Sequence, residues 1–365
     1  MKNFSDYKYQ INKKLKGKIF ILTGKNSFYK SGAYKLFENN NIKQEIKLYF
    51  KISKNPEVKE LKKIIKILYE FKPDIILPIG GGGVIDYAKI ANCINNITDL
   101  EKKIINSEYK LKRYRKLIAI PTTAGSGAEV TSNAVIYIDK IKFAFEGKEL
   151  IPDEFILIPN LILNSNFRLK ASAGFDAIAQ SIESLISRKS NNKSVYNAVK
   201  SLNLSMKYYL NYLKNPNIEN SYKMLLSANY SGKAISISKT TAPHAISYPF
   251  TSHFSIDHGH AVSLTLNKFL KFNYYNLKHS NCDFNLNNRY KIIFKVTNTK
   301  NIVELDNFLE NLKKKAKLED NFDKLGINID KSINKILDGV NILRLSNNPV
   351  SLKKKDLVYI LKNKI

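Results

Sequence analysis

Four consecutive glycines follow a short apolar stretch in the first half of the chain and precede a segment of helical character. The stretch Asp74–Ile79 (DIILPI) predicts a buried strand, and Val84–Lys89 (VIDYAK) predicts the first turns of a helix. Glycine has no Cβ, so the backbone here can approach a phosphate closely, and the amides of the following helix favour its negative charge. A plain strand-to-helix turn usually needs only one glycine. We therefore predict a phosphate-binding loop of Gly80, Gly81, Gly82 and Gly83, with Asp86 orienting the loop or the bound cofactor.

Strands and helices alternate on both sides of this loop. Gly17–Thr23 and Leu117–Ile120 predict buried strands, Val58–Phe71 has apolar residues at helical spacing, and a further strand is expected at Ala134–Ile138. A helical stretch is also expected between the first strand and Glu38. Such alternation is typical of an α/β domain with a parallel sheet.

From Ala171 onward the strand signals fade and long amphipathic patterns take over, as in Ser194–Leu213 and Ile302–Leu312. Polar residues at 190–193 and 281–289 predict surface loops. A chain of 365 residues with 44% apolar residues suits two domains. We expect an α/β domain at residues 1–165 and an all-helical domain at 166–365.

A second loop rich in hydroxyls and glycines, Pro121–Thr131 (PTTAGSGAEVT), follows the strand at Leu117–Ile120. Its side chains suit hydrogen bonds to phosphate, ribose and a nicotinamide amide, with Thr122, Thr123 and Ser126 as candidates. The alternative is a turn whose hydroxyls bond their own backbone. Neither loop has the GxGxxG or Walker pattern, so the two indicate a phosphate ligand without specifying it.

The chain is strongly basic, with 60 Lys and Arg against 31 Asp and Glu and a formal charge of +29. Such an excess first suggests nucleic acid or an anionic membrane. The lysines are spread over the whole chain, however, and no zinc-finger, aromatic RNA-binding or membrane-spanning pattern occurs. A solvated basic surface that attracts an acidic substrate is the preferred interpretation, with no nucleic-acid or membrane partner. Two distant cysteines and a polar N-terminus predict a soluble cytoplasmic protein.

Carboxylate, amide and imidazole groups gather in the second half. Asp176 and Gln180 lie four residues apart, on one face of a predicted helix. His244 and His258 lie downstream, in a short window that holds four of the five histidines. Imidazole and carboxylate together are a common ligand set for zinc or ferrous iron with an open position. His253 and His260, the other two in the window, are more typical of surface or supporting positions.

Four motifs in order, GGGGVIDYAK, PTTAGSGAEVT, GFDAIAQSIES and HAISYPFTSHFSIDHGHAV, resemble the signature of the iron-containing (group III) alcohol dehydrogenases. The resemblance implies an N-terminal dinucleotide-binding α/β domain and an all-α C-terminal domain, the architecture shared with dehydroquinate synthases. It also implies NAD(P)H and a divalent metal, Fe²⁺ or Zn²⁺, as cofactors. A homodimer is expected.

Residue by residue, Asp176, His244 and His258 match the family's metal ligands. Gln180 stands where many members have a histidine, and two alternatives stay open: the amide coordinates weakly, or the position is left to water. Tyr248 stands where many members carry a histidine near the reacting carbon, so Tyr248 or a water chain is expected to relay the proton. Gly24 replaces an aspartate typical of NAD-specific members, which makes NADPH admissible, with Lys25 and Ser27 near its 2′-phosphate.

Within the family, residues 232–248 and the glutamine of DAIAQSIES resemble the phosphonoacetaldehyde reductases. This resemblance implies reduction of phosphonoacetaldehyde to 2-hydroxyethylphosphonate, a small anionic aldehyde that needs cations near the metal. Lys239 is the nearest candidate by sequence, followed by Arg168 and Arg188. The alternatives are a broad-range alcohol or butanol dehydrogenase, a dehydroquinate synthase-like lyase and, more distantly, a basic nucleic-acid-binding protein.

Overall fold

The structure is a computed structural model that describes residues 3–38, 44–139 and 141–362. The polypeptide divides into two compact units. The first contains the residues up to Ser165 together with Pro216–Leu225, and the second contains Asn166–Asn215 and the residues from Leu226 onward.

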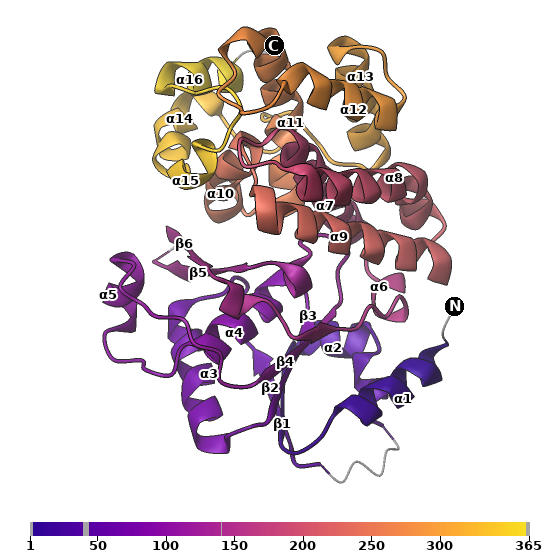
Figure 1. The fold of residues 1–365 in the computed structure, drawn as a ribbon, viewed down its shortest axis with the longest axis vertical. Coiled ribbons are helices and arrows are strands. Elements are labelled where there is room, and N and C mark those ends of the chain that lie inside the picture. Colours follow the sequence, from indigo (N-terminus) through magenta and orange to yellow (C-terminus); the bar gives the residue numbers. More distant parts are fainter. Residues whose placement is uncertain (1–2, 39–43, 140, 363–365) are drawn as a thin grey trace. The chain divides into compact units, whose positions relative to one another are not determined.

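The first unit is built on a parallel sheet with strand order β2-β1-β3-β4-β7. Figure 1 draws these strands in indigo to purple, side by side. Their bounds are β1 Ile19–Gly24, β2 Ile46–Lys51, β3 Ile75–Gly80, β4 Lys116–Pro121 and β7 Glu154–Phe155. Central β3 is buried along its whole length, as expected for a parallel sheet covered on both faces.

Alternate side chains of each strand point to opposite faces of the sheet, and each face has its own apolar core. Phe20 and Leu22 of β1 pack with residues of α3 and α4, whereas Ile19 and Ile21 pack with residues of α1, α2 and α6. Figure 1 shows α3 on one side of the sheet and α1 and α2 on the other. The bounds are α1 Phe4–Lys14, α2 Lys25–Lys30, α3 Val58–Phe71, α4 Gly82–Cys93, α5 Leu100–Ile105 and α6 Asn160–Leu163.

An antiparallel hairpin stands apart from the parallel sheet. Its strands are β5 Asn133–Ile138 and β6 Ile141–Glu146. The strand expected at Ala134–Ile138 is therefore present, but it pairs only with β6 among the named strands. The helix expected before Glu38 is split into α2 and a 3₁₀ turn, Ala33–Leu36, because Gly32 between them has a left-handed φ of 78°.

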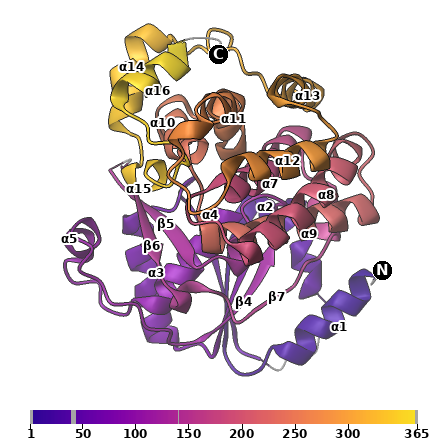
Figure 2. The same ribbon diagram turned by 45° about the horizontal axis from the view of Figure 1, so that its top comes forward.

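Among the described residues, the regular elements of the second unit are helices, joined by loops and one isolated β-bridge, Ser280–Val350. Its long helix α7 is almost wholly buried, and α8, α11 and α12 pack directly against it, as both views show (Figures 1 and 2). The bounds are α7 Phe167–Ile186, α8 Asn192–Lys214, α9 Ile218–Ser238, α10 Ala242–Phe254, α11 His258–Tyr275, α12 Leu286–Thr297, α13 Ile302–Lys315, α14 Ile329–Asp338, α15 Ile342–Leu345 and α16 Lys354–Lys362. Helix α9 begins in residues that group with the first unit.

The fold confirms the prediction of a parallel α/β half followed by a helical half. One predicted surface loop, residues 281–289, is shorter than expected, because α12 begins at Leu286 with the Asn285 side chain capping the Asn288 amide. Among the described residues, no helix combines the length and apolar character needed to cross a bilayer.

Candidate metal centre and cofactor loops

The glycine run forms a tight strand-to-helix turn between β3 and α4. Gly80 ends β3, and a Cβ added there would lie 2.5 Å from Cγ2 of Val84. A Cβ at Gly82 would lie 2.9 Å from the hydroxyl oxygen of Ser126, in the second predicted loop. The two loops are therefore in direct contact, and the glycines permit that approach.

The second loop follows β4, the neighbour of β3 in the sheet. The amide of Thr122 donates to the carbonyl of Gly80 at 3.0 Å, which ties the starts of the two loops together. Thr122 is buried, whereas Thr123 and Ser126 are partly exposed. Loops at the carboxyl ends of neighbouring parallel strands are the usual ligand-binding edge of an open α/β sheet, and the start of α4 adds its amides there.

Asp86 lies inside the protein, on the first turns of α4. Burial raises the pKa of its carboxyl group to about 6, although nearby Lys89 and the backbone amide of Val135 oppose the shift. Burial likewise lowers the pKa of Lys89 to about 8. The Lys89 ammonium donates to the Thr131 carbonyl at 2.8 Å and to the Thr131 hydroxyl at 2.7 Å. Lys89 thus attaches α4 to the end of the second loop, whereas the carboxyl group of Asp86 accepts from the backbone amide of Val135 on β5.

The third predicted cofactor segment follows β1. Gly24 ends the strand, and the Ser27 hydroxyl donates to its carbonyl at 3.0 Å. Lys25 is exposed. All three residues therefore lie at the carboxyl end of β1, which neighbours β3 in the sheet.

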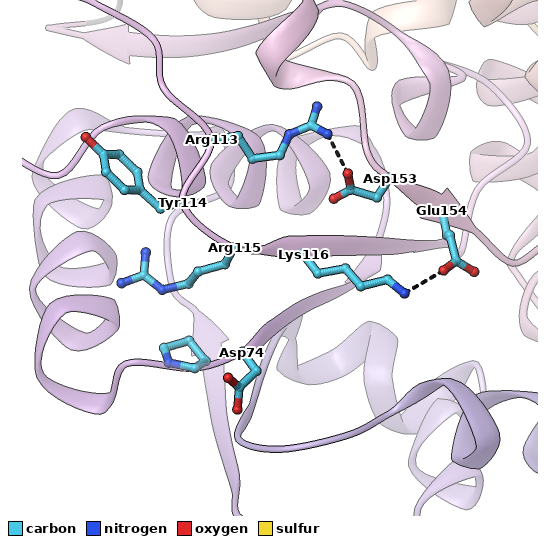
Figure 3. A pocket seen from close by; sticks show the side chains of 8 residues that line it. Asp74, Arg113, Tyr114, Arg115, Lys116, Asp153 and Glu154 are labelled. Atoms are coloured by element: carbon cyan, nitrogen blue, oxygen red, sulfur yellow. Dashed lines mark hydrogen bonds and ion pairs between the residues drawn. The ribbon is translucent and has the colours of Figure 1, made fainter.

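The opposite, amino edge of the sheet carries a different surface (Figure 3). A shallow pocket there is lined by Asp74, Arg113, Lys116 and Glu154 among others. Its charges are matched: Lys116 pairs with Glu154 at 2.7 Å, and Arg113 pairs with Asp153. Because acidic and basic groups neutralise one another here, this edge offers no comparable phosphate site.

Three side chains from three helices converge in the second unit. Asp176 comes from α7, His244 from α10, and His258 is the first residue of α11. Their potential ligand atoms all lie within 4.8 Å of one another. Nε2 of His244 lies 3.2 Å from Oδ1 of Asp176, and Nε2 of His258 lies 4.0 Å from the same oxygen. Among the described residues, no other His, Cys, Asp and Glu side chains form such a group.

Glu183 contacts the other ring nitrogen of His244, Nδ1. One of its oxygens forms a short contact with Nδ1 of His244, and the other accepts from the amide and the hydroxyl of Thr241, both at 2.9 Å. Because Nδ1 donates to the carboxylate, Nε2 is the nitrogen that faces the cluster and would bind a metal in place of its proton. Sequence reasoning assigned no role to Glu183. The signal available was its position, seven residues after Asp176 on one face of a helix.

The electrostatics of the cluster favour a cation. Burial alone would lower the pKa of His244, but Glu183 and Asp176 outweigh it and raise that pKa to about 10. Burial opposes ionisation of Asp176 as well, yet its hydrogen bonds to His244 and Gln180 and the charge of His258 hold its pKa below the usual value. Two buried carboxylates around one imidazole thus require positive charge between them. The donor set, with one carboxylate and two imidazoles, fits zinc or ferrous iron.

The position of His258 depends on close contact between α11 and α7. A Cβ added at Gly259 would lie 2.0 Å from the carbonyl oxygen of Ser172, so only glycine allows this approach. Asp257, the residue before His258, accepts from Nε of Arg168 at 2.8 Å. Arg168 therefore lies beside the start of α11, with most of its side chain exposed.

The remaining predicted residues lie at different distances from the cluster. The ring of Tyr248 stacks on that of His258 with centroids 6.1 Å apart, next to the candidate ligands. Arg188 donates to the backbone carbonyls of Asn281 and Ser346, at 3.2 Å each. Lys239 follows α9 in a left-handed turn, φ 61°. His260 points elsewhere, with its Nε2 2.6 Å from the carbonyl oxygen of Glu319.

The family models for iron-containing alcohol dehydrogenases match nearly the whole chain. The model described as "Iron-containing alcohol dehydrogenase" matches residues 4–159, and "Fe-containing alcohol dehydrogenase family, C-terminal" matches residues 170–365. The fold and the cluster define a metal-binding, nucleotide-binding α/β plus helical protein. The chain belongs to the iron-containing alcohol dehydrogenase family, which uses NAD(P)H and a divalent metal such as iron or zinc.

The individual relatives share less than 30% sequence identity with this chain. Over 224 residues the chain is 27% identical to a 4-hydroxybutyrate dehydrogenase of Clostridium kluyveri, with 60% of either protein covered. Over 218 residues it is 28% identical to the phosphonoacetaldehyde reductase of Streptomyces viridochromogenes, covering 57% of this chain and 55% of the relative. The matches thus span only 55–60% of these two relatives.

Among solved structures, the sulfoacetaldehyde reductase of Bifidobacterium kashiwanohense, in complex with NAD⁺, superposes with a TM-score of 0.85 at 23% identity. The similarity covers 99% of this chain and 94% of that one. At this identity the match shows the shared fold.

Proposed function

We propose that this protein is a metal-dependent NAD(P)H oxidoreductase that reduces an aldehyde to a primary alcohol. The observation that carries the proposal is the convergence of Asp176, His244 and His258 in a chain of this family. In the proposed reaction the reduced nicotinamide transfers a hydride to the aldehyde carbon, and one proton is added to the oxygen. The nicotinamide is oxidised and the aldehyde is reduced by the same two electrons.

Each chemical task of the proposed reaction has a candidate residue in the chain. Asp176, His244 and His258 would hold the divalent ion, which when bound supplies Lewis-acid polarisation of a carbonyl group. Glu183 holds His244 in the tautomer that presents Nε2. The glycine loop, with Thr122, Thr123 and Ser126, would bind the cofactor's pyrophosphate and neighbouring groups.

Tyr248 is the candidate for the proton relay. Its ring stacks on His258, so it lies beside the candidate ligands, and it is half-buried. A phenol there can pass a proton from solvent to an alkoxide product directly or through water. Replacement by phenylalanine keeps the stacking and removes only the hydroxyl.

For the substrate we propose phosphonoacetaldehyde, reduced to 2-hydroxyethylphosphonate. Two of the relatives above are named for two-carbon aldehydes that carry a phosphonate or a sulfonate, and a third is named for a substrate with a carboxylate. A small anionic aldehyde also suits a chain of formal charge +29. Arg168 is the preferred cation, because it lies beside Asp257 next to His258 and is largely exposed. Lys239 and Arg188 remain candidates, and the Arg188 guanidinium donates to two backbone carbonyls.

The test is an oxidation screen of NADH and NADPH with phosphonoacetaldehyde, sulfoacetaldehyde and butyraldehyde at defined added metal. We expect phosphonoacetaldehyde to give the highest kcat/KM, and NADPH to be accepted because Gly24 carries no carboxylate against a 2′-phosphate. Equal kcat/KM for butyraldehyde would instead indicate a broad-range alcohol dehydrogenase. Cofactor that is recycled rather than consumed would indicate a dehydroquinate synthase-like lyase.

A salt series of nucleic-acid binding tests the remaining alternative. A nucleic-acid-binding protein would show affinity that falls steeply with salt and is indifferent to the loss of His244. We expect only weak, nonspecific binding from the basic surface.

A further inference from the structure

Gln180 lies beside the candidate metal centre, on the same face of α7 as Asp176 and one turn after it. Its carboxamide has two polar contacts. Nε2 lies 3.0 Å from Oδ2 of Asp176, and Oε1 lies 2.9 Å from the hydroxyl of Ser231 on α9. All three residues are buried, with exposed fractions of 3% for Gln180, 4% for Asp176 and 0% for Ser231.

The chemistry of these neighbours determines which end of the amide faces which partner. An ionised carboxylate only accepts hydrogen bonds, so the group against Asp176 must be the amino group of Gln180. The amide oxygen then faces Ser231, whose hydroxyl can donate to it. The same hydroxyl also lies 2.9 Å from the carbonyl of Ala228, one turn earlier on α9, so its single hydrogen is shared between these two acceptors.

The two oxygens of Asp176 therefore have different surroundings. Oδ2 accepts from Gln180, whereas Oδ1 faces Nε2 of His244 and of His258. An amide bound in this way directs its oxygen away from the histidines and toward α9. Only one oxygen of Asp176 remains directed into the cluster.

We propose that Gln180 is a positioning residue of the metal centre and not one of its ligands: Ser231 fixes its carboxamide so that the amino group holds Oδ2 of Asp176 and leaves Oδ1 for the metal. The inference rests on the proposed metal site. It gives the centre three protein ligands, Asp176, His244 and His258, and leaves room for a substrate oxygen. Ser231 then acts on the metal only through Gln180.

The test is a double-mutant cycle on Co²⁺ affinity, measured by competition with a chelator in Gln180→Leu, Ser231→Ala and the double variant. We expect about tenfold weaker binding for Gln180→Leu and roughly three- to tenfold weaker binding for Ser231→Ala. Because Ser231 acts through Gln180, the second substitution should cost nothing further in the Gln180→Leu background. The visible spectrum of bound Co²⁺ should be the same in every variant, since no ligand changes.

The matched control is Ser227→Ala. Ser227 is also fully buried, one turn before Ser231 on α9, but it bonds Ser201 of α8. The Ser227→Ala variant should have the Co²⁺ affinity of the unmodified protein. Thermal unfolding of the metal-free variants reports any loss of fold. An altered Co²⁺ spectrum in Gln180→Leu, unchanged affinity in Ser231→Ala, or additive losses in the cycle would each overturn the inference. Failure of the unmodified protein to bind Co²⁺ would instead overturn the metal site itself.

Discussion

At the scale of single residues, we propose that Glu183 prepares His244 to act as a ligand. Glutamine is nearly isosteric with glutamate and can keep the contacts to Thr241, but its amino group would donate to Nδ1 of His244. The imidazole proton would then move to Nε2 and occupy the lone pair needed for a metal. We predict that Glu183→Gln weakens metal affinity about 10- to 100-fold while the protein stays folded.

Chelator competition with Zn²⁺ measures this effect. Glu310→Gln, an exposed change on α13, serves as the control and should match the unmodified protein. Unchanged Zn²⁺ affinity in Glu183→Gln would show that the carboxylate has no part in preparing the site.

Asp86 gives a prediction for the pH dependence of stability. Its pKa is about 6 in the folded protein, against 3.8 for an ordinary aspartate, so the folded state binds more protons between these values. The Asp86 carboxyl group therefore contributes to folding stability below about pH 4, and this contribution is lost as the pH rises toward about 6. Asp86→Asn lacks this titration. The stability of the unmodified protein relative to Asp86→Asn should fall by on the order of 2–3 kcal/mol across that window.

Urea unfolding of the two proteins at a series of pH values provides the comparison. A stability difference that stays constant from acid to neutral pH, or that grows in favour of the unmodified protein, would contradict a raised pKa at Asp86.

At the scale of elements, the contact between α7 and α11 sets the position of His258. Ala at Gly259 would place Cβ 2.0 Å from a backbone oxygen of α7, so the start of α11 must move away. We predict a loss of about 1–3 kcal/mol in unfolding free energy, as for other overpacked sites, and a parallel loss of metal retention. In the control Gly339→Ala, the nearest atom to an added Cβ is a side-chain carbon of Pro249, 3.0 Å away. Gly339→Ala should retain its metal. Equal metal contents in the two variants would show that the α7–α11 contact at Gly259 does not control metal retention.

How far the elements can be predicted depends on the pattern each carries. Helix α3 has apolar residues on one face only, and its predicted bounds, Val58–Phe71, are those observed. Strand β2 was not predicted because it is half-exposed and carries lysines, IKLYFK, and β7 has only two residues. The antiparallel pairing of β5 likewise depends on a partner strand that its own residues do not specify.

At the scale of the whole molecule, the two predicted loops and the three candidate ligands could be identified from residue types and family motifs. The supporting residues could not, because their roles depend on pairing between distant helices. Glu183 meets Thr241 across 58 residues, and Ser231 meets Gln180 across 51. A serine in the middle of a helix carries no sequence signal for such a contact.

The candidate cofactor loops and the candidate metal centre belong to different compact units, so we expect their binding steps to be separable. Gly82→Ala, which places Cβ 2.9 Å from the Ser126 hydroxyl, should weaken NADH and NADPH binding at least about tenfold, or 1.4 kcal/mol, and leave metal content unchanged. His258→Ala should instead lose its metal and leave NADH and NADPH binding unchanged. Cofactor fluorescence titration and elemental analysis of both variants test this, and loss of both ligands in either variant would argue against separate sites.

We propose that Asp176, His244 and His258 hold the metal on which aldehyde reduction depends. The most direct measurement follows NAD(P)H oxidation with phosphonoacetaldehyde, in chelator-treated protein, as Zn²⁺ or Fe²⁺ is returned in steps. We predict that turnover in the unmodified protein rises with bound metal to one equivalent per chain, and that His258→Ala neither retains metal nor turns over. Full aldehyde reduction by metal-free His258→Ala protein would contradict the claim.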